Sequence, residues 1–196
     1  MSFIDKTNIV IKKNNNDLYY FDIDKDIVLT KINNKNDILL SKILFTGDYS
    51  FVDIWLDTNE KDNIYGIIND KKGKILNLNI EEDNIDKHTM IKYDYKNFIV
   101  KFPYTKHISN IKHTIYYSIN KSIPLLANLI HIYEDDNIYV KNTIDFIDYN
   151  ILSNFVVAYS NNRPIIFYFK LVDKFEELFV STFDLNSRSW SKPIQI

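Results

Sequence analysis

The chain has 196 residues, of which 45% are hydrophobic and 15% aromatic, so it is long enough and apolar enough to bury the core of one domain. Its formal net charge of −2, with both signs interspersed, argues against nucleic acid as a partner. The absence of cysteine excludes disulfides and thiolate metal sites, and neither a signal peptide nor an apolar run of membrane-spanning length is visible. These features favour a cytoplasmic protein without a membrane span, and a cell-surface or secreted location stays compatible with them.

Short apolar runs separated by polar turns fill the chain, and they fall into four groups of four. In chain order the runs are 9–11, 18–22, 27–32 and 38–44; 51–56, 64–68, 75–80 and 88–91; 98–102, 112–119, 125–133 and 138–144; and 155–159, 165–171, 178–183 and 189–194. Most have the length of a strand and are rich in Ile, Val, Tyr and Phe, which fit a pleated surface. Since no long stretch sustains a helical period with caps, we predict an all-β fold.

One register recurs in all four groups. An apolar residue is followed by four residues that are mostly polar and then by seven residues that end in isoleucine; the four segments are 32–43, 80–91, 133–144 and 183–194. A second landmark lies upstream of each segment, where Leu18, Ile64, Ile115 and Ile166 each begin a short run containing tyrosine or phenylalanine. The period of roughly 50 residues is typical of repeat architectures such as propellers.

The repeat predicts a β-propeller with four blades of four antiparallel strands, because each group is one meander too small to bury its faces alone. The expected blades are approximately 8–44, 51–91, 98–144 and 154–196, either as a closed four-bladed ring or as the N-terminal part of a larger propeller. A sandwich or a barrel would not require the constant register. Residues 70–73 and Asn161–Asn162 carry the clearest turn signals.

The last group resembles a blade of the sialidase-like propellers, whose Asp-box reads Ser/Thr-x-Asp-x-Gly-x-Thr-Trp. Thr182, Asp184, Ser189 and Trp190 match in kind and order, with Asn186 at the usual glycine position and one extra residue before the tryptophan. The same stretch is also similar to the tryptophan-containing strand of Kelch blades. The resemblance implies a structural role, in which Asp184 holds the turn and Trp190 packs between blades.

No catalytic residue, metal site or cofactor is predicted. The sialidase family grips its substrate with three arginines, and this chain has only Arg163 and Arg188. The Asp-rich segment 22–26 lacks the glycine and the final glutamate of a calcium loop. Among the four histidines, His131 alternates with apolar residues, which predicts a core or interface position rather than a ligand.

Binding is instead expected on the loops between blades, together with the turns between second and third strands, because propellers present such loops on a rigid scaffold. Tyrosine beside Asp or Asn suits a sugar: the ring stacks on its apolar face while the polar groups bind its hydroxyls. The predicted ligand residues are Asp48, Tyr49, Tyr93, Asp94, Tyr95, Asp148 and Tyr149.

These observations predict a non-catalytic binding or scaffolding module that recognises a glycan or a protein. The alternative is part of a glycoside-processing enzyme whose catalytic residues lie outside this chain. The sequence gives no indication of the oligomeric state.

Overall fold

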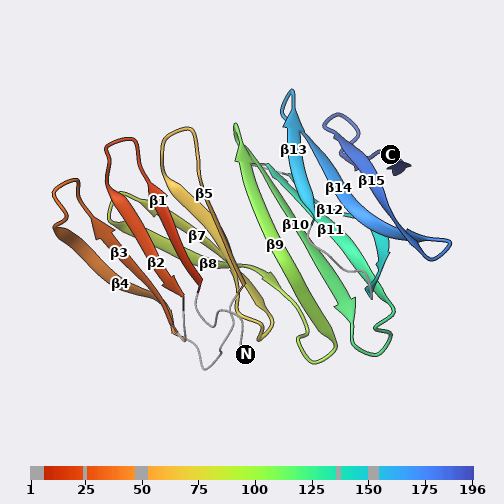
Figure 1. The fold of residues 1–196 in the computed structure, drawn as a ribbon, viewed down its shortest axis with the longest axis horizontal. Helices are drawn as coiled ribbons and strands as arrows, with labels where there is room; N and C mark the ends of the chain where they lie inside the picture. The colour runs from red at the N-terminus through yellow and green to blue at the C-terminus, as the bar shows by residue number, and fades with distance from the viewer. Residues whose placement is uncertain (1–6, 24–25, 47–52, 136–137, 150–154) are drawn as a thin grey trace. The chain divides into compact units, whose positions relative to one another are not determined.

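The computed structural model describes residues 7–23, 26–46, 53–135, 138–149 and 155–196 (Figure 1). In these ranges the regular elements are β-strands, and no α-helix is present. No helix of the described residues is therefore long and apolar enough to cross a membrane. The chain divides into two compact units, one formed by Met1–Asp70 and Lys74–Ile91 and the other by Lys71–Gly73 and Lys92–Ile196.

The first unit contains two sheets of four strands, each in sequential order. One sheet consists of β1 (Thr7–Lys12), β2 (Leu18–Ile23), β3 (Asp26–Ile32) and β4 (Ile38–Thr46). The other consists of β5 (Asp53–Thr58), β6 (Ile64–Asn69), β7 (Lys74–Glu81) and β8 (Asn84–Lys92).

The second unit also contains two sheets. One consists of β9 (Phe98–Ile108), β10 (Ile111–Asn120), β11 (Leu126–Asp135) and β12 (Ile138–Asp148). The other consists of β13 (Val156–Ser160), β14 (Arg163–Val172), β15 (Phe175–Asp184) and two short segments, β16 (Ser189–Trp190) and β17 (Ile194–Gln195). Both short segments pair with β15, so together they occupy the position of a fourth strand.

The strands carry the sequence register at the predicted places. Ile32 ends β3, while Ile80, Tyr133 and Phe183 lie within two residues of the ends of β7, β11 and β15. Each recurring segment therefore contains the end of a third strand and the turn that follows it. The residues after the turn pair with that third strand. The predicted all-β class with four repeated meanders is confirmed.

Each unit has its own apolar core between its two sheets. In the first unit Phe21, Leu29, Ile64 and Leu78 are fully buried members of one cluster that draws on both sheets. In the second unit Ile115, Leu129, Ile166 and Tyr168 belong to the corresponding cluster. Full burial of one such side chain stabilises the fold by about 1.5–3 kcal/mol, so these layers fix the sheets of each unit against one another.

Two turns show how the local sequence sets the hairpins. Asn161 and Asn162 both have positive φ, at 50° and 62°, and join the paired residues Ser160 and Arg163, which is the geometry of a two-residue hairpin. Between β6 and β7 the Asp70 carboxylate accepts a 2.8 Å hydrogen bond from the Lys74 N–H, and Gly73 has a φ of 104°. Both turns are those that the sequence predicts.

Candidate functional site

Four segments of the second unit are joined by backbone hydrogen bonds. The Tyr93 N–H donates to the Gly73 carbonyl at 2.8 Å, the Lys121 N–H donates to the Asn97 carbonyl at 2.8 Å, and the Tyr149 N–H donates to the Leu125 carbonyl at 3.0 Å. We call the surface formed by residues 71–73, 92–97, 120–126 and 148–149 the loop face. It combines the inter-blade segments 92–97 and 148–149 with the turns between second and third strands, as the propeller topology predicts.

The first inter-blade segment is held by its own aspartate. Asp94 accepts hydrogen bonds from the Lys96 N–H at 3.0 Å and from the Asn97 side chain at 2.6 Å. The bond from the Asn97 side chain, followed by that from the Lys96 N–H, lowers the pKa of the Asp94 carboxyl. Asp94 thus shapes the loop, and the carboxylate stays ionised at neutral pH.

Tyr95 is exposed, with 45% of its surface accessible. Its carbonyl accepts a 2.7 Å hydrogen bond from Lys121 Nζ. A Cβ atom added at Gly73 would lie 2.6 Å from the Tyr93 carbonyl oxygen and 3.4 Å from Tyr95 Cδ1, so glycine permits this close approach of turn and loop. The Tyr95 ring is thereby presented from a fixed backbone.

Asp148 and Tyr149 lie at the far end of the same row of loops. Asp148 ends β12 opposite Leu126 and is half-buried. Lys101 Nζ lies 5.2 Å from the centre of the Tyr149 ring and 3.4 Å from its hydroxyl oxygen, which is a cation–π arrangement. The turn between β10 and β11 connects this end to Tyr95 through Lys121 and Leu125.

The remaining two predicted ligand residues, Asp48 and Tyr49, lie outside the described residues. The structure thus places Tyr93, Asp94, Tyr95, Asp148 and Tyr149 on one row of loops in the second unit, and their role in binding stays a prediction.

The sequence interpretation missed an apolar ridge on the loop face. Ile123, Leu125, Leu126 and the nearby Phe146 are exposed large hydrophobic residues. Leu126 pairs with Asp148, and Phe146 pairs with Asn128, so Leu126 and Phe146 are diagonal neighbours on one face of the sheet. The apolar run 125–133 predicts a strand, and nothing in its composition marks its first two residues as exposed.

A buried histidine pair lies in the core of the second unit, away from solvent. His113 Nδ1 and His131 Nε2 are 3.0 Å apart, and both residues are fully buried. The rings of Tyr133, Tyr159, Phe183 and Trp190 contact one or both imidazoles. Burial lowers the pKa of His113 to about 4 and that of His131 well below its usual value, so both imidazoles are neutral at pH 7. His131 occupies the core position that its alternation predicts.

The Asp-box-like turn follows β15. Asp184 accepts hydrogen bonds from the N–H groups of Asn186 and Ser187, at 3.0 and 2.7 Å, and from the Ser187 hydroxyl at 3.0 Å. Thr182 lies in β15, Ser189 pairs with Asp184, and Trp190 packs against the core of the second unit. These hydrogen bonds all lie within the turn, so Asp184 holds the turn in place.

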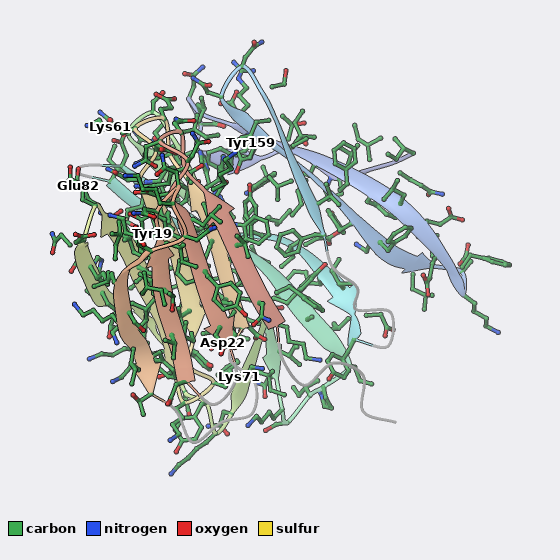
Figure 2. All side chains as sticks on the ribbon, turned by 60° about the vertical axis from the view of Figure 1, so that its left-hand side comes forward. Tyr19, Asp22, Lys61, Lys71, Glu82 and Tyr159 are labelled. Carbon is green, nitrogen blue, oxygen red and sulfur yellow. The ribbon has the colours of Figure 1, made fainter. Side chains whose placement is uncertain are left out.

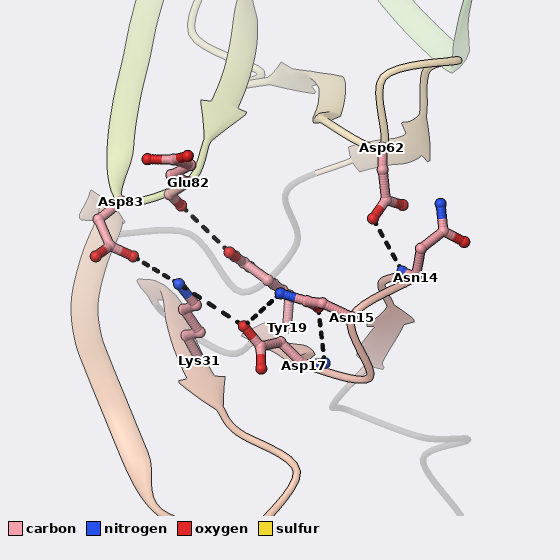
Figure 3. Close-up of polar contacts among 8 residues, drawn as sticks. All are labelled: Asn14, Asn15, Asp17, Tyr19, Lys31, Asp62, Glu82 and Asp83. Atoms are coloured by element: carbon pink, nitrogen blue, oxygen red, sulfur yellow. Dashed lines mark hydrogen bonds and ion pairs between the residues drawn. The ribbon is translucent and has the colours of Figure 1, made fainter.

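A polar network lies in the first unit and joins its two sheets (Figure 3). The Tyr19 hydroxyl donates to the Glu82 carbonyl at 3.2 Å, Lys31 Nζ lies 2.9 Å from an Asp83 oxygen, and the Asn14 N–H donates to the Asp62 carboxylate at 2.9 Å. In Figure 2, Glu82 and Lys61 lie at the opposite end of this unit's strands from Asp22. The network joins β2, β3 and the turn between β1 and β2 to turns of the other sheet, which is a structural arrangement.

In the described part of the chain, no group of three or more His, Asp or Glu side chains is placed to hold a metal ion.

The solved structures similar to this chain are β-propeller proteins. An α-L-arabinofuranosidase (CtGH43) from Clostridium thermocellum superposes over 97% of this chain and 72% of its own, with a TM-score of 0.52 and 9% identity. The WD40 domain of SCAP from fission yeast superposes over 96% of this chain and 42% of its own, with a TM-score of 0.52 and 11% identity. The α-L-arabinofuranosidase PaAbf62A from Podospora anserina, in complex with cellotriose, superposes over 95% of this chain and 66% of its own, with a TM-score of 0.50 and 10% identity.

No protein-family model matches the sequence, and no curated protein matches it. At this level of identity the likeness shows the fold alone. Together with the four sheets it identifies a β-propeller in which each sheet is one blade. The fold prediction is confirmed at this level, whereas the likeness does not single out the sialidase or Kelch families.

Proposed function

We propose that this chain is a non-catalytic binding module that recognises its ligand, a glycan or a protein, through the loop face of the second unit. The observation that carries the proposal is the exposed Tyr95 ring, whose loop is fixed by hydrogen bonds from Lys121 and Asn97. An aromatic ring presented from a fixed loop costs little conformational entropy on binding, so it is suited to anchor a partner. The second tyrosine, Tyr149, is held in the same row of loops by its bond to Leu125.

Replacing Tyr95 or Tyr149 with alanine is expected to weaken binding of a ligand found by glycan or peptide array by about tenfold or more, because each change removes contact area from the loop face. The thermal midpoint should stay nearly unchanged for Tyr95→Ala, since its ring is exposed. Isothermal titration calorimetry and thermal unfolding measure the two quantities.

Tyr139 provides a matched control, because it is an exposed tyrosine near the start of β12, at the opposite end of that strand from Asp148. Tyr139→Ala should leave affinity unchanged. If Tyr139→Ala weakened binding as much as Tyr95→Ala, the ligand would not lie on the loop face.

A second candidate function is part of a glycoside-processing enzyme, and the similarity to two α-L-arabinofuranosidases favours it. Glycoside hydrolysis requires two carboxyl groups about 5–10 Å apart across the bond that is cleaved. On the loop face Asp94 uses its oxygens to hold its own loop. This local use of Asp94 supports binding over catalysis.

Purified protein should therefore release no more nitrophenol from nitrophenyl α-L-arabinofuranoside, and from a panel of other nitrophenyl glycosides, than a heat-denatured sample does. Turnover above that control, abolished by Asp148→Asn and retained by Tyr139→Ala, would replace the binding proposal with the enzymatic one.

A further inference from the structure

The loop face carries a concentration of positive charge that the composition of the whole chain conceals. Its lysines are Lys71, Lys72, Lys92, Lys96 and Lys121. Its acidic residues are Asp94 and Asp148. The surface is therefore positive, although the chain as a whole has a net charge of −2. Such a local excess attracts ligands of opposite charge and raises their rate of association.

The lysines border the apolar ridge formed by Ile123, Leu125, Leu126 and Phe146. The exposed fractions of these four side chains are 61%, 66%, 48% and 55%. Ile123 and Leu125 lie in the turn between β10 and β11, Leu126 begins β11, and Phe146 adjoins Leu126 on the sheet. A cluster of exposed apolar side chains at the end of a rigid sheet is typical of a surface that a partner covers.

We propose that the loop face binds an acidic protein segment that also carries apolar side chains; this inference rests on the proposed function and names the class of its ligand. The carboxylates of the segment meet the lysines, and its apolar side chains cover the ridge. The backbone of Tyr95 lies beside the turn that carries the ridge, because Lys121 donates to the Tyr95 carbonyl and the ridge begins two residues after Lys121.

The combination of charge and apolar surface favours a protein over other ligands. A neutral glycan has no charge to pair with the lysines. An acidic glycan or a nucleic acid would pair with the lysines through sulfate, carboxylate or phosphate groups, but would leave the aliphatic side chains of the ridge uncovered. A protein segment supplies both kinds of group at the spacing of neighbouring side chains.

Fluorescence anisotropy with defined probes tests this proposal. The main probe is a short labelled peptide in which Asp and Glu alternate with Leu and Phe. The comparison probes are the same peptide with Asn and Gln in place of the acids, polyglutamate, a heparin oligosaccharide and a single-stranded DNA oligonucleotide. The acidic apolar peptide should bind most tightly, and its affinity should fall between about 50 and 200 mM salt because the contribution of the charges is screened.

Two variants of the chain separate the contributions. Lys92→Glu combined with Lys96→Glu should weaken binding of the acidic apolar peptide by about tenfold or more, and Leu125→Ser should weaken it independently of salt. Lys35→Glu, in the exposed turn between β3 and β4 of the first unit, is the matched control and should have no effect. Thermal unfolding establishes that each variant is folded.

Failure of the inferred ligand class and failure of the proposed loop-face function give different results. If heparin or DNA bound more tightly than the acidic apolar peptide and Tyr95→Ala abolished that binding, the ligand class inferred here would be wrong and the proposed loop-face function would stand. If the peptide bound equally well to the double lysine variant and to Lys35→Glu, the inference would also be overturned. If the acidic apolar peptide did not bind at all, the inference would fail, and the array experiment with Tyr95→Ala would still decide the proposed function.

Discussion

Replacing Trp190 with alanine is expected to lower the free energy of unfolding by about 3 kcal/mol, because truncation of a packed tryptophan to alanine typically costs about 3–5 kcal/mol. The Trp190 ring centre lies 5.2 Å from that of His131 and 5.4 Å from that of Phe183. The side chain is half-buried, so the lower end of the range applies. Urea denaturation followed by circular dichroism measures the change.

Trp55 is the matched control, since it is the other tryptophan and has 37% of its surface exposed. Trp55→Ala should cost less than Trp190→Ala. The Trp190 variant should bind ligand normally at temperatures where it is folded, because Trp190 packs on the core cluster of the second unit rather than on the loop face. Loss of binding in fully folded Trp190→Ala protein would contradict both the structural role of the Asp-box-like turn and the location of the binding surface.

The strands and their grouping could be predicted because the repeat carries redundant information. A single apolar run is ambiguous between strand and buried helix, but four runs in a constant register are not. Residues such as Ile32 and Ile80 each mark the approach to a polar turn, and the structure places them at or near the ends of β3 and β7. Turn chemistry added local detail, as at Asn161 and Asn162, where positive φ costs little.

Other features depend on tertiary structure and could not be read from the sequence. Phe102 has a φ of 51° beside an irregularity in the pairing of β9 with β10, although phenylalanine rarely adopts positive φ. Leu125 and Leu126 are as apolar as the buried residues that follow them, yet they are exposed because they lie where β11 begins, at the end of its sheet. Composition alone does not report where a strand emerges from its sheet.

The candidate site was predictable in topology but not in chemistry. The repeat indicates that the inter-blade segments and the turns between second and third strands share one end of the strands, and the hydrogen bonds of Tyr93, Lys121 and Tyr149 show these segments joined in the second unit. The clustering of lysines was not visible, because Lys71 and Lys121 are distant in the sequence and acidic residues elsewhere offset their charge.

Acidification from pH 7 to pH 5 is expected to destabilise the protein through its buried histidines. Burial lowers the pKa of His113 and of His107 to about 4 and lowers that of His131 as well, whereas an unfolded histidine titrates near 6.5. Below pH 6.5 the unfolded chain therefore binds protons that the folded protein does not bind. Stability is fully present above pH 6.5 and is lost as the pH falls toward 4.

The expected loss at pH 5 is about 2 kcal/mol for one histidine whose pKa is about 4 when folded and 6.5 when unfolded. The midpoint of urea denaturation, measured at intervals between pH 7 and pH 4, reports this loss. Carboxylates whose pKa is lowered, such as those of Asp94 and Asp184, contribute at lower pH, since their stabilisation is lost only as the pH falls below about 4. The histidine contribution therefore has a pH window of its own.

Substitution of His113 by phenylalanine tests whether the buried pair is the source. The variant removes one imidazole from the core, so the decline in stability between pH 6.5 and pH 4 should become shallower, whatever its stability at pH 7. His88→Gln is the control: His88 is exposed, with its ring nitrogen 3.0 Å from an Asp86 oxygen, and its removal should leave the decline unchanged. A stability that does not change between pH 7 and pH 5 in the natural sequence would show that the folded protein takes up protons at the pair without cost. That result would be incompatible with two imidazoles 3.0 Å apart in a core that excludes water.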